Sequence, residues 1–386
     1  MSDYRVYLDG APAGADLYAA LSTLEVEENA DLPDALRAVL TLAPGSADPT
    51  WVGDGRLKPF TNVAVVVTTD DGRRDCIFDG YLLAHRAHLE AGITSSTLEV
   101  WGQDASVLMT LEDKVREWSG MTEGEVANQI FSDYGFTPAA ANTADDSPAH
   151  TDDGHTLMQR ATDAEFLRRL ARRSGRWFRV SCNDEPGQRA GFFAAPDLSG
   201  QPVATIDLND PAMSATPSLE FAWDVARPSK VTARQASLVE AHAEGTGAVA
   251  TDSGLPALET RGLRDFAGRD VSMLLTSCVD EADLRVRARA ALRDAGWFAR
   301  CEGTVDLAAL KRVVRVGALV AVAGVGDLHS GTYLAQTVRH TITADAHTMG
   351  LHLVRNAVGP APSGATTGPG AAATGAGAAG AAGGGF

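Results

Sequence analysis

The strongest fold signal in this chain of 386 residues lies at positions 310–354, LKRVVRVGALVAVAGVGDLHSGTYLAQTVRHTITADAHTMGLHLV. Its first part, residues 316–323, is apolar and rich in β-branched side chains, which is typical of a strand. Residues 324–331 are turn-forming. Residues 332–343 and 348–354 then alternate β-branched or aromatic residues with polar ones. The stretch therefore predicts an antiparallel meander of three strands.

A second stretch near the other end of the chain has the same order of features. It is LKPFTNVAVVVTTDDGRRDCIFDGYLLAHRAHLEAGITSSTLEVWG, residues 57–102. Both stretches start on Leu-Lys, continue as an apolar strand, turn through polar residues and resume at a glycine. In each, the middle strand ends in a histidine, His88 or His340, before a turn and a closing strand. We interpret the pair as a degenerate internal repeat; the alternative is that two unrelated meanders resemble each other by chance.

The length and the charge of the chain limit the number of domains and the choice of partners. A chain of 386 residues exceeds the usual size of one domain, so two or more are expected. The formal net charge of −17 repels phosphate groups, so nucleic acid and anionic membranes are poor partners. No apolar run suits a membrane helix, so no direct membrane insertion is expected. The N-terminus has no secretory signal pattern, so synthesis and assembly in the cytoplasm are expected.

Two strand-rich regions flank a region of mixed type. The first holds five or six antiparallel strand segments, enough for a small barrel or sandwich. Two helical patterns and three strand patterns follow, which predict a small α+β domain. The last region returns to strand pattern with one further helix. The expected domains are β-rich at 1–103, α+β at 104–215 and β-rich at 216–358 with a helix at 281–294, followed by a low-complexity tail at 359–386.

Helix-capping residues mark the starts of the three helices. Thr122 with Glu125, and Thr162 with Glu165, have the spacing of a capping box. Asp280 caps the third helix. Gly135 and Gly175 stand where a helix commonly ends on glycine. The tail at 359–386 consists almost only of small residues, so it cannot bury enough apolar surface to order alone.

The sequence carries no recognisable catalytic, cofactor or metal motif. None of the four cysteines forms a CxxC pair, which excludes a zinc ribbon and a thioredoxin motif. No GxSxG or GxxxxGK[ST] motif is present. We interpret two charged groups as solvated: the loop residues His150, Asp152, Asp153 and His155, and the helical arginines Arg285, Arg287, Arg289 and Arg293. No catalytic residue, cofactor or metal is therefore expected.

Several segments, taken in order, resemble the late control D proteins of phages. They are FDGYL at 78–82, LEVWGQD at 98–104, the capped helix at 121–135, and QRATDAEFLRRLARRSGRWFRV at 159–180. Residues 331–340 with 348–353 are similar to the end of the hub region of the valine-glycine repeat spike proteins of type VI secretion. The resemblance covers residues 20–356, in the order of the family.

The resemblance implies the baseplate hub of a contractile, phage tail-like injection particle. Such a hub is a homotrimer with two tube-like antiparallel β-barrels per chain. It adapts a hexameric inner tube to a trimeric spike, and it contacts other baseplate proteins. No spike-like repeat follows residue 358, so the spike is expected to be a separate chain. The alternative is a cell-wall hydrolase of such a particle, which two acidic residues facing one cleft would favour.

Two aromatic residues are candidate interface anchors. Trp51 lies in a connector at 44–59 that is longer than a tight hairpin needs. We predict that its ring packs on a neighbouring subunit; the alternative is that it folds onto its own barrel. Phe386 is the only aromatic residue of the tail, and we predict that it anchors the tail against the spike or inside the lumen.

Overall fold

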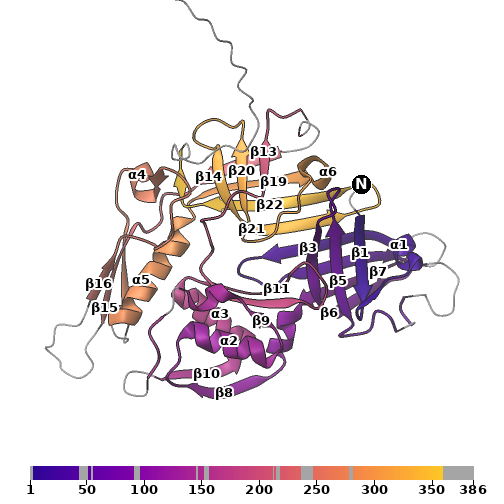
Figure 1. Cartoon of the computed structure of the whole chain (residues 1–386), viewed down its shortest axis with the longest axis horizontal. Coiled ribbons are helices and arrows are strands. Elements are labelled where there is room, and N and C mark those ends of the chain that lie inside the picture. Colours follow the sequence, from indigo (N-terminus) through magenta and orange to yellow (C-terminus); the bar gives the residue numbers. More distant parts are fainter. Residues whose placement is uncertain are drawn as a thin grey trace, which may run out of the picture.

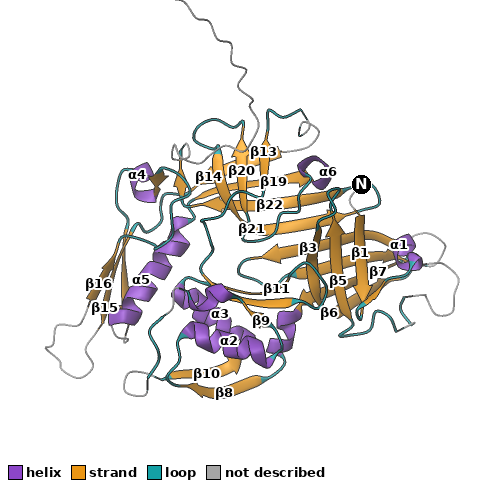
Figure 2. Ribbon diagram, in the orientation of Figure 1, coloured by secondary structure: helices purple, strands orange, loops and turns teal. Residues whose placement is uncertain are grey.

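A computed structural model describes residues 3–42, 51–53, 55–90, 96–144, 147–151, 156–211, 213, 218–235, 247–277 and 281–359. The fold is mainly β with a smaller share of helix, as the sequence predicts (Figure 2). Thirteen of the described strands belong to one large sheet. Two five-stranded blocks make up most of this sheet.

The first block comes from the N-terminal part of the chain. Its strands pair in the order β3-β4-β7-β6-β5, and every neighbouring pair is antiparallel. Strands β3, β4 and β7 bury about every second side chain, because successive residues of a strand face opposite sides. The block consists of β3 (Leu21–Asn29), β4 (Ala35–Thr41), β5 (Asn62–Thr68), β6 (Arg74–His88) and β7 (Thr97–Asp104).

The second block comes from the C-terminal part of the chain and has the same strand order. Its strands pair as β14-β19-β22-β21-β20, again all antiparallel. In both blocks the second strand of the meander carries a β-bulge, at Leu83 in β6 and at Gln336 in β21. The shared order supports the predicted repeat. The block consists of β14 (Ser218–Trp223), β19 (Ala299–Asp306), β20 (Leu319–Ala323), β21 (Gly331–Ile342) and β22 (His347–Arg355).

The two blocks are joined by an antiparallel pairing of β3 with β21. It matches Leu24–Asn29 against Thr337–Ile342, and we call it the seam. Figure 1 shows the two blocks side by side. Buried apolar residues of both blocks belong to one continuous core. The resemblance implies two tube-like barrels per chain, and the hydrogen bonds of the sheet run through both blocks in one path. Closure of each block into a tube remains a prediction.

The flanks of the two blocks differ. β1 (Asp3–Leu8) pairs antiparallel with β5 and carries the short β2 (Ala11–Pro12) on its other side. β13 (Ala204–Asp207) pairs parallel with β20. The sequence pattern predicts that residues 204–207 belong to the α+β domain, whereas the hydrogen bonds of β13 place it in the large sheet. Two short helices, α1 (Ala15–Ala20) and α6 (Leu307–Leu310), lie beside the sheet strands.

The α+β region has a core of its own. Phe131, Leu167, Phe178 and Phe193 are among its buried residues. In Figure 1 its helices lie against β11, below the large sheet. Its strands form two separate sheets, the pair β8-β10 and the three-stranded sheet β11-β12-β9. The region contains η1 (Ala105–Thr110), β8 (Asp113–Trp118), α2 (Glu123–Asp133), β9 (Thr137–Pro138), η2 (Ala140–Thr143), β10 (Leu157–Thr162), α3 (Asp163–Ser174), β11 (Trp177–Cys182) and β12 (Arg189–Ala194).

A small outlying unit packs one long helix on three strands. α5 (Glu281–Gly296) covers one face of the sheet β16-β15-β18 through Leu284, Ala288 and Leu292. Two short strands and a short helix, β16, β17 and α4, form within residues 247–268. The unit and its surroundings contain β15 (Lys230–Gln235), β16 (Gly247–Ala250), β17 (Arg261–Gly262), α4 (Leu263–Ala267) and β18 (Ser272–Ser277); β17 pairs with β23 (Ala357–Val358).

The predicted caps stand at the ends of α2 and α3. Thr122 and Glu125 form the reciprocal capping box of α2. At α3 the Thr162 hydroxyl accepts from the Glu165 N–H, but the Glu165 carboxylate pairs with Arg169 instead. Asp280, the predicted cap of α5, lies outside the described residues. No helix in the described part of the chain is long and apolar enough to cross a membrane.

Candidate functional site

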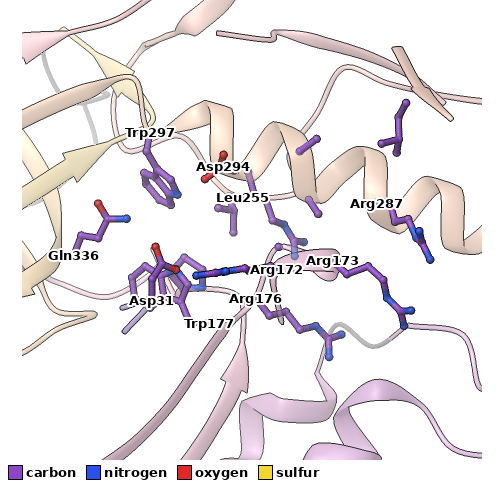
Figure 3. Close-up of a pocket in the computed structure, with 16 residues that line it drawn as sticks. Asp31, Arg172, Arg173, Arg176, Trp177, Leu255, Arg287, Asp294, Trp297 and Gln336 are labelled. Carbon is purple, nitrogen blue, oxygen red and sulfur yellow. The ribbon is translucent and has the colours of Figure 1, made fainter. Parts of the chain in front are cut away.

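A cleft of about 470 Å³ lies between the end of α3 and the middle of α5 (Figure 3). Its lining comes from all three regions of the chain. Asp31 belongs to the β3–β4 turn and Gln336 to β21. Most of the other lining residues belong to the α3–β11 and α5 segments, while Pro196 follows β12, Leu255 lies between β16 and β17, and Leu275 lies in β18. Five of the lining residues are arginines: Arg172, Arg173, Arg176, Arg287 and Arg293.

The two helices approach closely because small residues meet at the base of the cleft. Gly175 ends α3 in the left-handed region, with φ +66°. A Cβ atom on it would lie 2.7 Å from the Cα atom of Ala290 in α5. Such a distance is far below van der Waals contact, so only glycine fits this position without a shift of backbone. The close contact leaves Arg172 and Arg173, in the last turn of α3, beside α5.

Some of the cleft arginines are held by partners just outside the lining. Arg173 pairs with the buried carboxylate of Glu123, and Arg287 pairs with Asp283 at 2.8 Å. The Nε–H of Arg293 donates to the Ser253 carbonyl at 2.8 Å. These bonds fix the direction of the guanidinium groups.

Two aspartates, Asp31 and Asp294, also line the cleft. Asp31 lies beside Arg172 in Figure 3. Although part of the Asp31 side chain reaches solvent, burial by the surrounding chain raises its pKa, against the attraction of Arg172 and Arg168. The Asp294 charge also raises it.

The side chains that line the cleft are of types that bind anionic groups. Guanidinium groups present planar forks of donors that match carboxylate or phosphate oxygens. Trp177, Trp297, Leu255 and Leu275 add apolar surface. Within the described residues, no group of three or more His, Cys, Asp or Glu side chains could hold a metal ion. The cleft is therefore a candidate anion site.

A second polar feature, the ionic junction, is buried and structural. Glu28 of β3 is fully buried and receives Arg179 of β11 at 3.4 Å, together with Arg315 and the Val316 N–H before β20. The junction therefore ties the first block, the α+β region and the second block together at one carboxylate. Removing one partner of such a buried ion pair leaves the other charge uncompensated, which strongly lowers the stability of the fold.

Neighbouring carboxylates enlarge the ionic junction. Arg179 also pairs with Asp34 at 3.0 Å, and the Asp34 N–H donates to Asp104 at 2.5 Å. Burial raises the pKa of Asp34 to about 7, against the Arg179 charge and with help from Asp104 and Glu28. For Arg179, the charges of Asp34 and Glu28 outweigh burial, which acts to lower its pKa, and so they raise it. Sequence reasoning missed this cluster because its members are spread over the whole chain.

Trp51, the predicted anchor, lies within the chain's own core. Only 5% of it is exposed, and the Arg56 guanidinium stacks over its ring at 4.0 Å. An anchor role would require the ring to leave this position, and it remains a prediction. Phe386 lies outside the described residues. So do Asp152, Asp153 and His155 of the predicted solvated loop, whereas His150 is described and buried.

The arginines of α5 differ from the uniform solvated face predicted for them. Arg285 and Arg289 are exposed, as that interpretation requires. Arg293 is buried and Arg287 is half-buried, and both line the cleft. One face of α5 carries Arg287, Ala290, Ala291 and Asp294, which follow helical spacings of three and four residues. This spacing is visible in the sequence and could have identified the side of the helix that faces the cleft.

The overall fold is found in proteins of known structure. A tail protein of Neisseria meningitidis MC58 has a TM-score of 0.62 at 15% identity, covering 92% of this chain and 97% of its own. The 43 kDa tail protein of prophage MuSo2 from Shewanella oneidensis gives 0.60 at 14%, with 92% and 99% covered. An E. coli component of the type VI secretion system gives 0.54 at 13%, with 93% and 79% covered.

The fold is thus one that tail proteins and a type VI secretion component share. Residues 37–344 match the family described as the Alg8 N-terminal domain, and the chain belongs to that family. No curated protein matches the sequence. The shared fold supports the predicted resemblance to tail and type VI secretion proteins, and the resemblance to late control D proteins remains a prediction.

Proposed function

We propose that this chain is the structural baseplate hub of a contractile, phage tail-like injection particle. In this role it forms a homotrimer that joins a hexameric inner tube to a separate trimeric spike, in contact with other baseplate proteins. The observation that carries the proposal is the repeated strand order β3-β4-β7-β6-β5 and β14-β19-β22-β21-β20 within one chain.

The repeat supplies the match of symmetries. Three chains with two similar blocks each present six similar units around one axis. A ring of three closes with a single kind of chain–chain contact and leaves no open end. The tube then meets six units, and the spike meets three chains. Stable contacts of this kind typically bury about 2,000 Å² or more of surface. Each chain has a net charge of −17, so the chains repel one another, and the apolar and strand-edge contacts must outweigh this repulsion.

The proposed domain limits follow the sequence analysis. Residues 1–103 and 216–358 hold the two tube-like barrels, residues 104–215 the α+β domain apart from β13, which pairs with β20 of the second block, and residues 359–386 the low-complexity tail. The chain acts without catalysis, as part of a virion or injection machine put together in the cytoplasm. Support comes from the solved proteins of the same fold, which are described as tail proteins and as a component of a secretion system.

The test is the mass and the symmetry of the assembled protein. Light scattering after size exclusion, with the tube or spike protein added when the free chain is monomeric, is expected to give three copies. Electron microscopy of the complex is expected to relate the two blocks by a pseudo-six-fold rotation. A stable dimer or tetramer, or a trimer without that rotation, contradicts the proposal. A peptidoglycan zymogram tests the absence of catalysis, since a cleared band would favour the hydrolase.

A further inference from the structure

The cleft between α3 and α5 reverses the charge balance of the chain. The whole sequence has 33 Lys and Arg against 50 Asp and Glu. The cleft lining has five arginines against two aspartates, Asp31 and Asp294. Even with Glu123 and Asp283 counted as neighbours, cations outnumber anions at this place. We propose that the cleft binds an acidic polypeptide segment of a partner protein, with its carboxylates against the arginines.

The arginines reach the cleft from both sides. Arg172, Arg173 and Arg176 come from the end of α3 and the residues after it, and Arg287 comes from α5 (Figure 3). In the same view Arg173 and Arg287 extend toward the same side of the cleft, while Arg172 lies nearer the two tryptophans. Guanidinium groups spread in this way suit several carboxylates along an extended segment better than one compact ion.

The apolar part of the lining also favours a polypeptide. Trp177, Trp297 and Leu255 provide surface for the aliphatic stems of glutamate and for small residues between the acids. Tryptophan and arginine are the residues that most often dominate the binding energy of protein interfaces. A cleft of about 470 Å³ with such walls is larger than a phosphate ion needs.

Longer polyanions are disfavoured by the rest of the surface. A nucleic acid passing through the cleft would continue over a chain of net charge −17, which repels it. A short acidic segment ends before it meets that repulsion. Because the cleft lies where the three regions of the chain meet, a bound segment would hold α3, α5 and the β3–β4 turn in one arrangement. The site is independent of the proposed hub function.

The test uses the full chain and a short fluorescein-labelled peptide of alternating glutamate and alanine, followed by fluorescence anisotropy at low salt. The control peptide has glutamine in place of glutamate. Arg172→Gln is the main variant, because Arg172 is exposed and we expect the loss of an exposed side chain to leave the fold intact. Its matched control is Arg169→Gln, on the same helix and with the same charge change, where Arg169 pairs outside the cleft with Glu165. Arg287→Gln and Arg285→Gln form the same comparison on α5.

We expect the glutamate peptide to bind and the glutamine peptide not to bind. The two cleft variants should each weaken binding about ten-fold, since a charge-assisted bond is lost, and the two control variants should not. Equal weakening by all four variants would mean diffuse attraction and would overturn the proposal, as would the absence of binding. Arginine-dependent binding of pyrophosphate or single-stranded DNA without binding of the peptide would assign the cleft to phosphate instead. Circular dichroism checks that each variant is folded. Where Arg287→Gln is not, Arg287→Lys replaces it with Arg285→Lys as its control, and that comparison tests the planar fork of the guanidinium group rather than its charge.

Discussion

The Nδ1 atom of His340 lies 3.0 Å from the Nε2 atom of His347, within the buried side of the β21–β22 hairpin. Burial lowers the pKa of His347 to about 4. The pKa of His340 falls well below its usual value because of burial, the neighbouring His347 and the Arg315 charge. His340 also stands on the seam, opposite Val26 of β3. The pair is thus neutral in the folded chain near pH 7.

The histidine pair predicts a loss of stability in acid. A histidine with a lowered folded pKa binds its proton more readily in the unfolded chain, so its full contribution is present above pH 6.5 and is lost as the pH falls toward 4. Between pH 7 and pH 5 we expect about 2 kcal/mol of unfolding free energy to be lost per histidine. Urea unfolding at both values measures this. The free energy of unfolding should depend less on pH in His347→Gln, whereas replacing the exposed His88 by Gln should leave its pH dependence unchanged. The same pH dependence in His347→Gln as in the parent chain would contradict the role given to the histidine pair.

The ionic junction predicts a large cost for one neutral substitution. Glu28→Gln removes the charge that Arg179 and Arg315 share in a buried place, and we expect a loss of about 3–5 kcal/mol. Glu27→Gln is the matched control, one residue away on the same strand, where the carboxylate pairs with Arg339 nearer the surface. It should cost about 1 kcal/mol or less. Chemical denaturation of both variants decides the comparison, and similar losses would show that the junction is not stabilising.

Alanine substitutions at two glycines that follow helices distinguish the stability cost of backbone strain from that of overpacking. Gly135 and Gly175 both follow a helix with positive φ, at +72° and +66°. An alanine Cβ at position 135 would meet nothing within 4 Å, whereas at position 175 it would meet Ala290. We expect Gly135→Ala to cost about 1 kcal/mol from backbone strain, and Gly175→Ala to cost about 1–3 kcal/mol more from overpacking. Equal melting temperatures of the two variants would mean that α3 and α5 can separate freely.

The buried position of Trp51 predicts a loss of stability when it is removed. Trp51→Ala should destabilise the free chain by about 3–5 kcal/mol, because a large aromatic side chain leaves the core. Trp223, 53% exposed on β14, is the control, and its replacement by alanine should cost about 1 kcal/mol or less. Thermal unfolding of each variant, with the assembly state recorded separately, distinguishes a core role from an anchor role. A fully stable Trp51→Ala chain that fails to assemble would favour the anchor.

Local signals in the sequence predicted local structure well. The Thr122–Glu125 capping box, the Thr162 cap and the glycines after both helices act within a few residues, so the sequence alone displays them. The alternation in β4 and β7 reflects one buried face per strand, which is also visible without a partner.

The rest of the structure depends on contacts between distant segments. The seam pairs residues about three hundred positions apart, and no local pattern in β3 identifies β21 as its neighbour. β8 was missed because its DKVREW sequence is mostly charged, and β16 because GAVA is short and small. The cleft was missed for the same reason: its arginines converge only when Gly175 meets Ala290.

The geometry of the seam has a mechanical consequence. Its six residue pairs lie along the shared direction of two antiparallel strands. A force directed along the strands loads these hydrogen bonds together in shear, whereas a force across them would open the bonds one after another, like a zipper. The junction between the two blocks is therefore stiff in one direction and weak in another. A particle that drives this protein forward along the strand axis would use the stiff direction, and traction across the strands would be the way to part the blocks.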